Sequence, residues 1–412
     1  MGYSLFTLLI LSMAIVNFGL KINIQYEWKY TEFEWESQEQ KEAAINSGAY
    51  NPYNSLLADA SKADDGRIFI TATNLNGPGS PVTLTTVTNK TGPGGPVLRP
   101  YPDWSWYNSS CICDGIVNVY RTDIKCNHII VMDNGQIGLN RICNPKLLIF
   151  DLKNNTLVKT IYLPLDFATN RTGFGLLVMP LVYIPKECTQ FLNKMIVFIV
   201  DSGGSGLIVY DSSTKHMCRV ESDYMKPTDI FFSVANKNFT FEGGIYSMTI
   251  LDDELYYIPA SGKNIYKIKI KTLLQCPNKK EANKQNKFVT TLSNQSIVLT
   301  STEHSIFYSN LLENSILGMN VCKNSILGIN ICKNSNKNEV ELAQDDEKFQ
   351  VINSMKVSNY WNEMICMSNR YQNYLMNISN LSDINYRYFE IKLSEVQKIM
   401  NQHVYVLDFN IF

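Results

Sequence analysis

The chain contains 412 residues, enough for two or three average domains or for one large all-β domain. Hydrophobic residues make up 45% of it and charged residues only 18%, a balance that excludes a disordered or highly charged chain. The net charge of -1 gives no electrostatic basis for binding nucleic acid or an anionic membrane surface. The 23 tyrosines and 19 phenylalanines favour strands over helices, but composition alone does not indicate a function.

An apolar segment at the start of the chain is typical of a signal peptide. Leu5–Val16 is nearly all apolar, is too short to span a bilayer and is followed by polar sequence. No Lys or Arg precedes it, and the alternative interpretation is a buried N-terminal strand or helix. We expect residues 1–19 to be removed and residues 20–412 to form one secreted domain. No later apolar run is long enough for a membrane helix.

Secretion would place the ten cysteines in an oxidising environment, where several of them should pair. Cys111 and Cys113 form a C-x-C motif, for which a zinc site is the less favoured interpretation, with His128 the nearest histidine in sequence. The four histidines lie far apart and form no metal-binding motif. We therefore predict neither a metal site nor a cofactor.

Asn-x-Ser/Thr triplets provide candidate sites for N-linked glycosylation. Eight occur, at Asn89, Asn108, Asn154, Asn170, Asn238, Asn294, Asn377 and Asn380. Chance alone would produce several such triplets in a chain this rich in Asn. The triplets are therefore compatible with secretion but do not establish it.

A repeated pattern predicts the architecture. Six times, a short apolar strand runs into a turn rich in Asp, Asn, Ser or Gly and is followed by a second apolar segment. The first strands begin near Ile68, Ile129, Ile196, Leu255, Ile306 and Ile365. In the last unit we assign the second strand to Tyr374–Met376. The segments between units show no sustained helical periodicity, which argues against a parallel α/β fold.

Six units of this size predict an all-β six-bladed β-propeller. A short helix is predicted at the C-terminal end, over Leu393–Met400. If the two strands of each unit are the second and third of a blade, the six connecting turns lie on one face of the disc. They would bring six polar residues around one mouth of the central channel: Asn74, Asp133, Asp201, Ser261, Asn310 and Asn369.

These six residues are our candidate ligand-binding residues, because ligand sites favour channel mouths. The competing interpretation is that Asp, Asn and Ser are simply the residues that tight turns require.

Several segments make the chain similar to the major royal jelly protein/yellow family, and closest to its royal-jelly branch. The segments are Tyr26–Tyr30, Ala44–Tyr50, Gly94–Trp106, Cys143–Leu152, Gly206–Tyr210, Ser368–Gln372 and Ile384–Arg387. The resemblance covers nearly the whole chain after the leader and implies a secreted six-bladed propeller.

The resemblance implies several functions. Family members include nutritive glycoproteins, pigmentation proteins and salivary proteins that bind biogenic amines, and the royal-jelly members are associated with sterols and self-assembly. It therefore implies a non-catalytic protein that is nutritive or binds a sterol or an amine. It carries no catalytic residue onto this chain.

Four cysteines match the family pattern, and on that basis we predict two disulfides. Cys113 would pair with Cys126, and Cys143 with Cys188, while Cys111 competes for the same partner as Cys113. Cys322 and Cys332 are expected to be free or mispaired.

Two enzymatic alternatives remain open. One is a dopachrome-converting isomerase, suggested by kinship with the yellow branch. The other is a calcium-dependent hydrolase that would use oxygen ligands such as Asp133 and Asp201 in the channel.

A duplicated decapeptide at residues 314–323 and 324–333 is a further feature of this chain. Ten is an even number, so either copy could fill the same strand without reversing its buried face. We expect one copy to form the strand and the other to leave the sheet.

Overall fold

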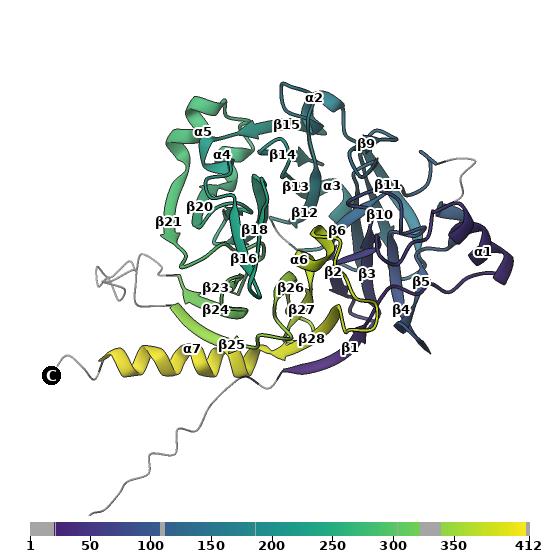
Figure 1. Cartoon of the computed structure of the whole chain (residues 1–412). Helices are drawn as coiled ribbons and strands as arrows, with labels where there is room; N and C mark the ends of the chain where they lie inside the picture. Colours follow the sequence, from purple (N-terminus) through teal and green to yellow (C-terminus); the bar gives the residue numbers. More distant parts are fainter. Residues whose placement is uncertain are drawn as a thin grey trace, which may run out of the picture.

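The computed structural model describes residues 20–408 except 21, 108–111, 186, 303 and 322–338. Six four-stranded antiparallel sheets stand around a common axis (Figure 1). The predicted six-bladed propeller is therefore confirmed. Blade 1 contains β2 (Leu56–Lys62), β3 (Ile68–Thr73), β4 (Leu84–Gly92) and β5 (Gly95–Pro100). Blade 2 contains β6 (Val119–Lys125), β7 (His128–Asp133), β10 (Lys146–Asp151) and β11 (Thr156–Tyr162).

The next blades repeat this order. Blade 3 contains β12 (Leu177–Tyr183), β13 (Ile196–Asp201), β14 (Gly206–Asp211) and β15 (His216–Glu221). Blade 4 contains β18 (Ile245–Leu251), β19 (Glu254–Pro259), β20 (Asn264–Lys269) and β21 (Lys287–Thr291). Blade 5 contains β22 (Leu299–Ser301), β23 (Ser305–Asn310), β24 (Ser315–Asn320) and β25 (Glu339–Gln344).

Blade 6 joins the two ends of the chain. It contains β26 (Val351–Ser358), β27 (Glu363–Asn369), β28 (Tyr386–Lys392) and the N-terminal strand β1 (Asn23–Trp28). β1 pairs antiparallel with β28, so the first strand of the chain completes the last blade. This pairing closes the disc.

Helices and small hairpins occupy the connections. The helices are α1 (Gln38–Asn46), α2 (Leu165–Ala168), α3 (Phe191–Lys194), α4 (Ile270–Leu273), α5 (Lys279–Gln285), α6 (Tyr371–Leu375) and α7 (Leu393–Asp408). Short 3-10 turns are η1 (Trp104–Tyr107) and η3 (Asp223–Met225), and two hairpins are formed by β8 (Gln136–Ile137) with β9 (Asn140–Arg141) and β16 (Phe231–Val234) with β17 (Lys237–Thr240). No helix in the described residues is long and apolar enough to cross a membrane.

The hydrophobic core is divided among the six junctions between neighbouring blades. In β7, Ile129 and Val131 pack in a cluster with blade 1, whereas Ile130 and Met132 pack in a cluster with blade 3. Side chains alternate across a strand, so a strand buried on both faces needs a continuous apolar run. The second strands could therefore be located in the sequence by their continuous apolar runs.

Most of the predicted strand positions are confirmed, with one correction. The six first-quoted strands are β3, β7, β13, β19, β23 and β27, each of which is the second strand of its blade. Tyr374–Met376, however, is not a strand, because Tyr371–Leu375 forms α6 and the third strand of blade 6 is β28. The predicted C-terminal helix is confirmed as α7 and extends to Asp408.

The first copy of the duplicated decapeptide supplies β24, which pairs with β23 and β25. The second copy, residues 324–333, lies outside the described residues, as do Cys322, Cys332, Cys111 and the leader.

The predicted disulfide pairing is wrong. Cys113 pairs with Cys143 and Cys126 pairs with Cys188. Cys113 precedes β6 and Cys126 follows it, so the seven-residue strand holds them at opposite ends, roughly 20 Å apart. A disulfide requires far closer α-carbons, as in the 5.5 Å between Cys113 and Cys143.

A third disulfide, which the sequence reading did not propose, joins Cys218 of β15 to Cys276, beyond α4. It links the outer part of blade 3 to blade 4. Cys366 is buried and has no disulfide partner.

Replacement of Trp28 tests the closure of the disc. Trp28 is fully buried between blades 6 and 1, and its Nε1 donates to the Pro96 carbonyl at 2.8 Å. We expect Trp28→Ala to lower the free energy of unfolding by about 3–5 kcal/mol, because it leaves a large cavity at the seam. Urea denaturation measures this, and Tyr53→Ala, at a residue with 56% exposure, is the matched control. Equal stability of the two variants would contradict a structural role for the seam.

Peptide mapping without reduction tests the disulfides. We expect three linked pairs, Cys113–Cys143, Cys126–Cys188 and Cys218–Cys276, because only these cysteines lie at bonding distance among the described residues. A Cys113–Cys126 peptide would show that blade 2 is assembled differently.

Candidate functional site

The six predicted ligand-binding residues all lie at the same position of the repeated unit. Each ends the second strand of its blade or follows it within two residues, and all six are buried. Because the blades share one strand order, the six turns lie on one face of the disc, which we call the turn face.

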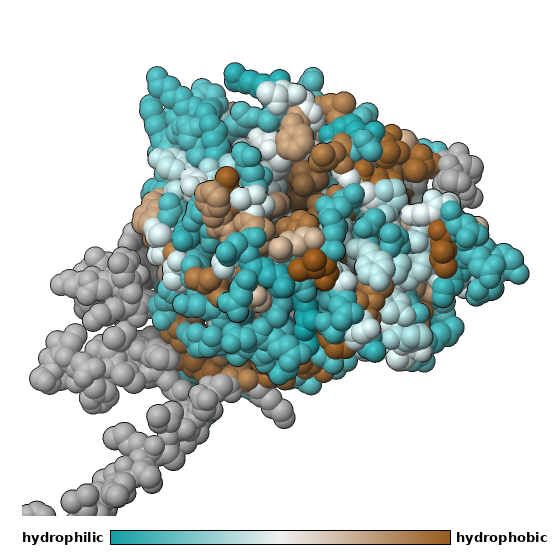
Figure 2. Space-filling view, in the orientation of Figure 1, coloured by the Kyte–Doolittle hydropathy of each residue, from teal (hydrophilic) through white to brown (hydrophobic). Residues whose placement is uncertain are grey.

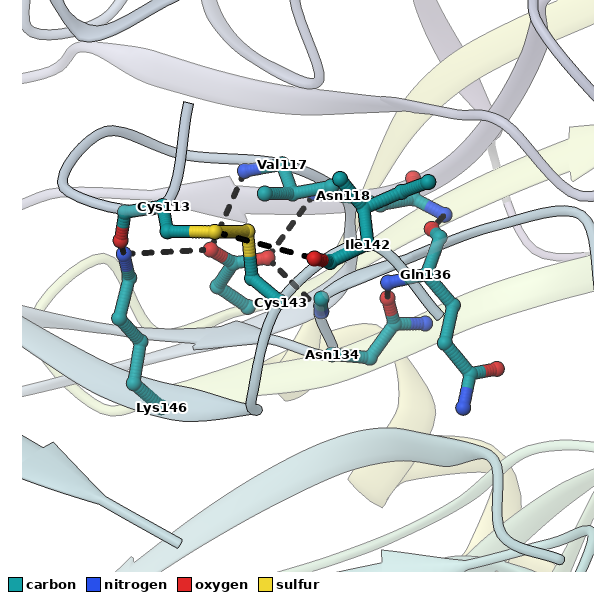
Figure 3. The surroundings of a disulfide bond; sticks show 10 residues. Cys113, Val117, Asn118, Asn134, Gln136, Ile142, Cys143 and Lys146 are labelled. Carbon is teal, nitrogen blue, oxygen red and sulfur yellow. Dashed lines mark hydrogen bonds and ion pairs between the residues drawn. A yellow bond between two sulfur atoms is a disulfide. The ribbon is translucent and has the colours of Figure 1, made fainter. Parts of the chain in front are cut away.

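Asp133 ties three segments of blade 2 together. Its carboxylate accepts from the backbone N–H groups of Val117 (3.1 Å), Asn118 (2.9 Å) and Gly135 (3.1 Å). Lys146 Nζ lies 3.8 Å from it and also donates to the Cys113 carbonyl, beside the Cys113–Cys143 disulfide (Figure 3). Burial raises the pKa of Asp133 and lowers that of Lys146, while the N–H donors and the opposite charges oppose these shifts.

Asp201 has the same role in blade 3. It accepts from the N–H groups of Leu176 at 2.7 Å and Gly204 at 2.8 Å, and Arg219 forms an ion pair with it at 2.9 Å. Burial raises the pKa of Asp201, and Arg219 opposes the increase. In both blades the carboxylate joins the second-to-third-strand turn to the segment that enters the first strand.

The four uncharged residues also bond within the turn face. Ser261 Oγ accepts from the Gly243 N–H and donates to the Phe241 carbonyl. Asn310 donates to Ser293 and Glu313, Asn74 exchanges hydrogen bonds with the backbone of Ser80, and Asn369 donates to the Leu57 carbonyl. All six side chains therefore hold turns in place. Their binding of a ligand stays a prediction.

Arg121 occupies the hub of the propeller and was missed by sequence reasoning. It is 4% exposed, and its Nη2 donates to the carbonyls of Ile297 (3.1 Å) and Asn353 (2.8 Å), which enter blade 5 and begin blade 6. Its guanidinium lies 4.6 Å from the ring centroid of Tyr246 in blade 4. No carboxylate of a described residue forms an ion pair with it. Arg121 Nη1 also lies 3.7 Å from Met179 Sδ in blade 3, so one cation in blade 2 contacts blades 3, 4, 5 and 6.

Several tyrosines lie on the turn face near Arg121, and Tyr246 contacts it. Tyr246 and Tyr371 are half-buried, and the ring of Tyr371 lies 6.3 Å from that of Tyr374 and 6.4 Å from that of Phe241. The buried Tyr120 hydroxyl has no hydrogen-bond partner in the described structure. Burial raises the pKa of Tyr374 to about 12, so its phenol stays neutral at physiological pH. Figure 2 shows brown, apolar residues among teal ones near the middle of the disc, where α6 and β6 lie in Figure 1. We call the surface formed by Tyr246, Tyr371 and Phe241 beside Arg121 the channel mouth.

Lys356 is a second cation among the innermost strands, and it bonds to the residue that follows Arg121. Lys356 Nζ contacts Asp59 Oδ2 at 2.5 Å, Ser61 Oγ at 2.6 Å and the Thr122 carbonyl at 2.7 Å. Asp59 also accepts from Ser354 Oγ at 2.7 Å. The Asp59 carboxylate is therefore already paired with an ammonium group.

Among the described residues, one cluster of side chains is of the types that bind metal ions. It lies at β15, the outer strand of blade 3, and not in the channel. It consists of His216, Cys218 and Cys276. The two sulfur atoms form a disulfide, with His216 Nδ1 3.5 Å from Cys276 Sγ, so neither cysteine offers a thiolate.

The sequence held only weak signals for this site. Arg121 interrupts the otherwise uncharged start of a strand, and the Tyr371–Tyr374 pair follows an Asn-Arg turn. Neither pattern has a spacing that marks a channel, because the contacts join blade 2 to four other blades.

The candidate glycosylation sites lie at or near the surface where the structure describes them. Asn89, Asn154, Asn238, Asn377 and Asn380 are exposed, Asn170 and Asn294 are half-buried, and Asn108 lies outside the described residues.

Comparisons with known proteins agree on one family. A family model described as major royal jelly protein matches residues 117–401, more than half of the chain. Major royal jelly protein 3 of Apis mellifera is 32% identical over 402 residues, which cover 93% of this chain and 71% of that protein. Major royal jelly protein 7 of the same organism is 29% identical over 391 residues, covering 90% of this chain and 85% of the relative.

Replacement of Asp133 tests the scaffolding role of the turn residues. In Asp133→Asn the amide NH2 would face a backbone N–H donor, and Lys146 would lose its negative neighbour. We expect the free energy of unfolding to fall by about 2–4 kcal/mol in urea denaturation. Asp64→Asn, at an exposed carboxylate, is the control and should change it by less than about 0.5 kcal/mol. A stable Asp133→Asn protein would show that the carboxylate is not needed for the fold.

Proposed function

The chain belongs to the major royal jelly protein family, and from that membership we propose that it is a secreted, non-catalytic glycoprotein. Its role would be nutritive, or it would hold a small apolar or aromatic ligand, a sterol or a biogenic amine, at the channel mouth. The observation that supports binding is the half-buried aromatic surface of the turn face, where Tyr246 lies against Arg121 and Tyr371 lies beside Phe241.

Secretion is supported by two independent features. The chain begins with an apolar segment typical of a signal peptide. The structure has three disulfides, which persist in oxidising compartments and are rare in the cytosol.

The chemistry of the channel mouth favours a neutral ligand over a protonated amine. Tyr246 and Tyr371 provide aromatic faces that an apolar ring system can cover. Arg121 carries a positive charge that no carboxylate pairs with in the described structure. A cationic ligand placed beside it would be repelled, and more strongly as water is excluded. A sterol or another uncharged ring compound is therefore the favoured class.

The absence of an acid–base pair among the described mouth contacts supports a non-catalytic role. The side chains that contact Arg121 are the ring of Tyr246 and the thioether of Met179, and no histidine is among its described contacts. The nearest carboxylate along the strand, Asp123, accepts from the Val182 N–H at 2.8 Å, and burial raises its pKa. Asp59 is bound to Lys356. Neither carboxylate is therefore free of a partner in the described structure.

Mass spectrometry of the purified secreted protein tests the proposal. We expect a small apolar or aromatic molecule to co-purify, and cholesterol to bind more tightly than serotonin in a direct binding measurement. Replacing both Tyr246 and Tyr371 by Ala should weaken cholesterol binding roughly tenfold, because two aromatic contacts of about 0.5–1.5 kcal/mol each are lost. Tyr53→Ala is the control. No bound molecule together with no binding of either probe would leave only the nutritive role.

Two assays with the same protein address the enzymatic alternatives. Turnover of dopachrome would favour the isomerase. Stoichiometric calcium with esterase or lactonase activity would favour the hydrolase. We expect neither.

A further inference from the structure

A cavity lies on the face opposite the channel mouth. It has a volume of about 620 Å³ and is formed where blades 3 and 4 meet. Its lining comes from the end of β12, the start of β13, the β18–β19 turn and the β20–β21 connection. These connections lie at the strand ends opposite the turn face, so the cavity is separate from the channel mouth. Its volume is within the range of cavities that hold small ligands, about 300–1,000 Å³.

One side of the cavity is apolar. Ile196 is 4% exposed and Ile270 is 3% exposed, and Pro185 and Leu274 complete this surface. Ile196 begins β13 in blade 3 and Ile270 begins α4 in blade 4. An aliphatic chain placed between the two blades would therefore contact hydrocarbon on both sides.

The rim of the cavity carries lysines without partners. Lys269, Lys271 and Lys287 are exposed and form no ion pair or side-chain hydrogen bond with any described residue. The fourth lysine, Lys267, is already bound to Glu254 at 2.5 Å, yet it stands directly across the β20–β21 ladder from Lys287. Like charges at opposing positions repel, and a bound anion would relieve that repulsion.

The acidic residues at the cavity are less available than the lysines. Asp253 Oδ1 accepts from the Tyr183 hydroxyl at 2.5 Å, and its backbone carbonyl accepts from the Ile270 N–H. Asp252 also has an interaction partner. The hydrogen bond from Tyr183 leaves the charge of Asp253 in place. The lining contains four lysines and three acidic residues, so its formal net charge is +1.

We propose that this cavity binds a small amphipathic organic anion, a medium-chain fatty carboxylate. The carboxylate lies among Lys269, Lys271 and Lys287, and the alkyl chain covers Ile196, Ile270 and Leu274. The site does not depend on the function proposed for the channel mouth.

Calorimetric titration of the secreted protein with decanoate tests this site. We expect one decanoate per chain, at least tenfold weaker binding of butanoate because the apolar surface is left uncovered, and at least tenfold weaker binding of decanol because the charge is absent. Replacing Lys269, Lys271 and Lys287 together by Gln should weaken decanoate binding at least tenfold. The control replaces the exposed Lys125, Lys153 and Lys215, which do not line the cavity, by Gln.

The channel-mouth variant separates this inference from the proposed function. Tyr246→Ala with Tyr371→Ala should leave decanoate binding unchanged. If that variant abolishes binding, decanoate binds beside Arg121 and the inference is wrong. It is also overturned if decanoate shows no saturable binding, or if both triple lysine variants bind as the unchanged protein does. All six lysines are exposed, so circular dichroism is expected to show intact folding of both variants.

Discussion

The pairing of β1 with β28 is the constraint on which the rest of the structure depends. A propeller buries its apolar side chains between blades, so an open ring would leave two blade faces in water. The N-terminal strand prevents this by completing the last blade, and Trp28 packs in the seam between blades 6 and 1. With the ring closed, all six hydrophobic clusters are complete, and each joins neighbouring blades.

Closure also places the polar side chains of the turn face and the hub. Asp133 and Asp201 each bond to the segment that enters the first strand of their own blade, so they fix where that strand begins along the axis. Neighbouring first strands contact one another around the ring. Arg121 can therefore reach carbonyl groups of two blades across the channel. The tyrosines of the channel mouth are brought together by this geometry.

The two faces of the disc differ in chemistry. The channel mouth combines aromatic rings with one buried cation, whereas the cavity between blades 3 and 4 combines an aliphatic surface with exposed lysines. Neither arrangement supplies a free carboxylate–histidine pair among the described residues that form it. The two proposed binding sites therefore call for ligands of different chemistry. This separation follows from the propeller, in which each face is built from a different set of connections.

The sequence by itself determined the fold class, the number of blades and the second strand of each blade. The reason is local: a run such as Ile129–Met132 must be buried on both faces, and the Asp-Asn-Gly that follows it must turn. Sequence similarity also identified the family. The tertiary structure alone decided which cysteines pair, because β6 separates Cys113 from the nearby Cys126 and brings it beside Cys143. It likewise decided that Tyr371–Leu375 is a helix and that Arg121 lies at the hub, since both depend on contacts between blades distant in sequence.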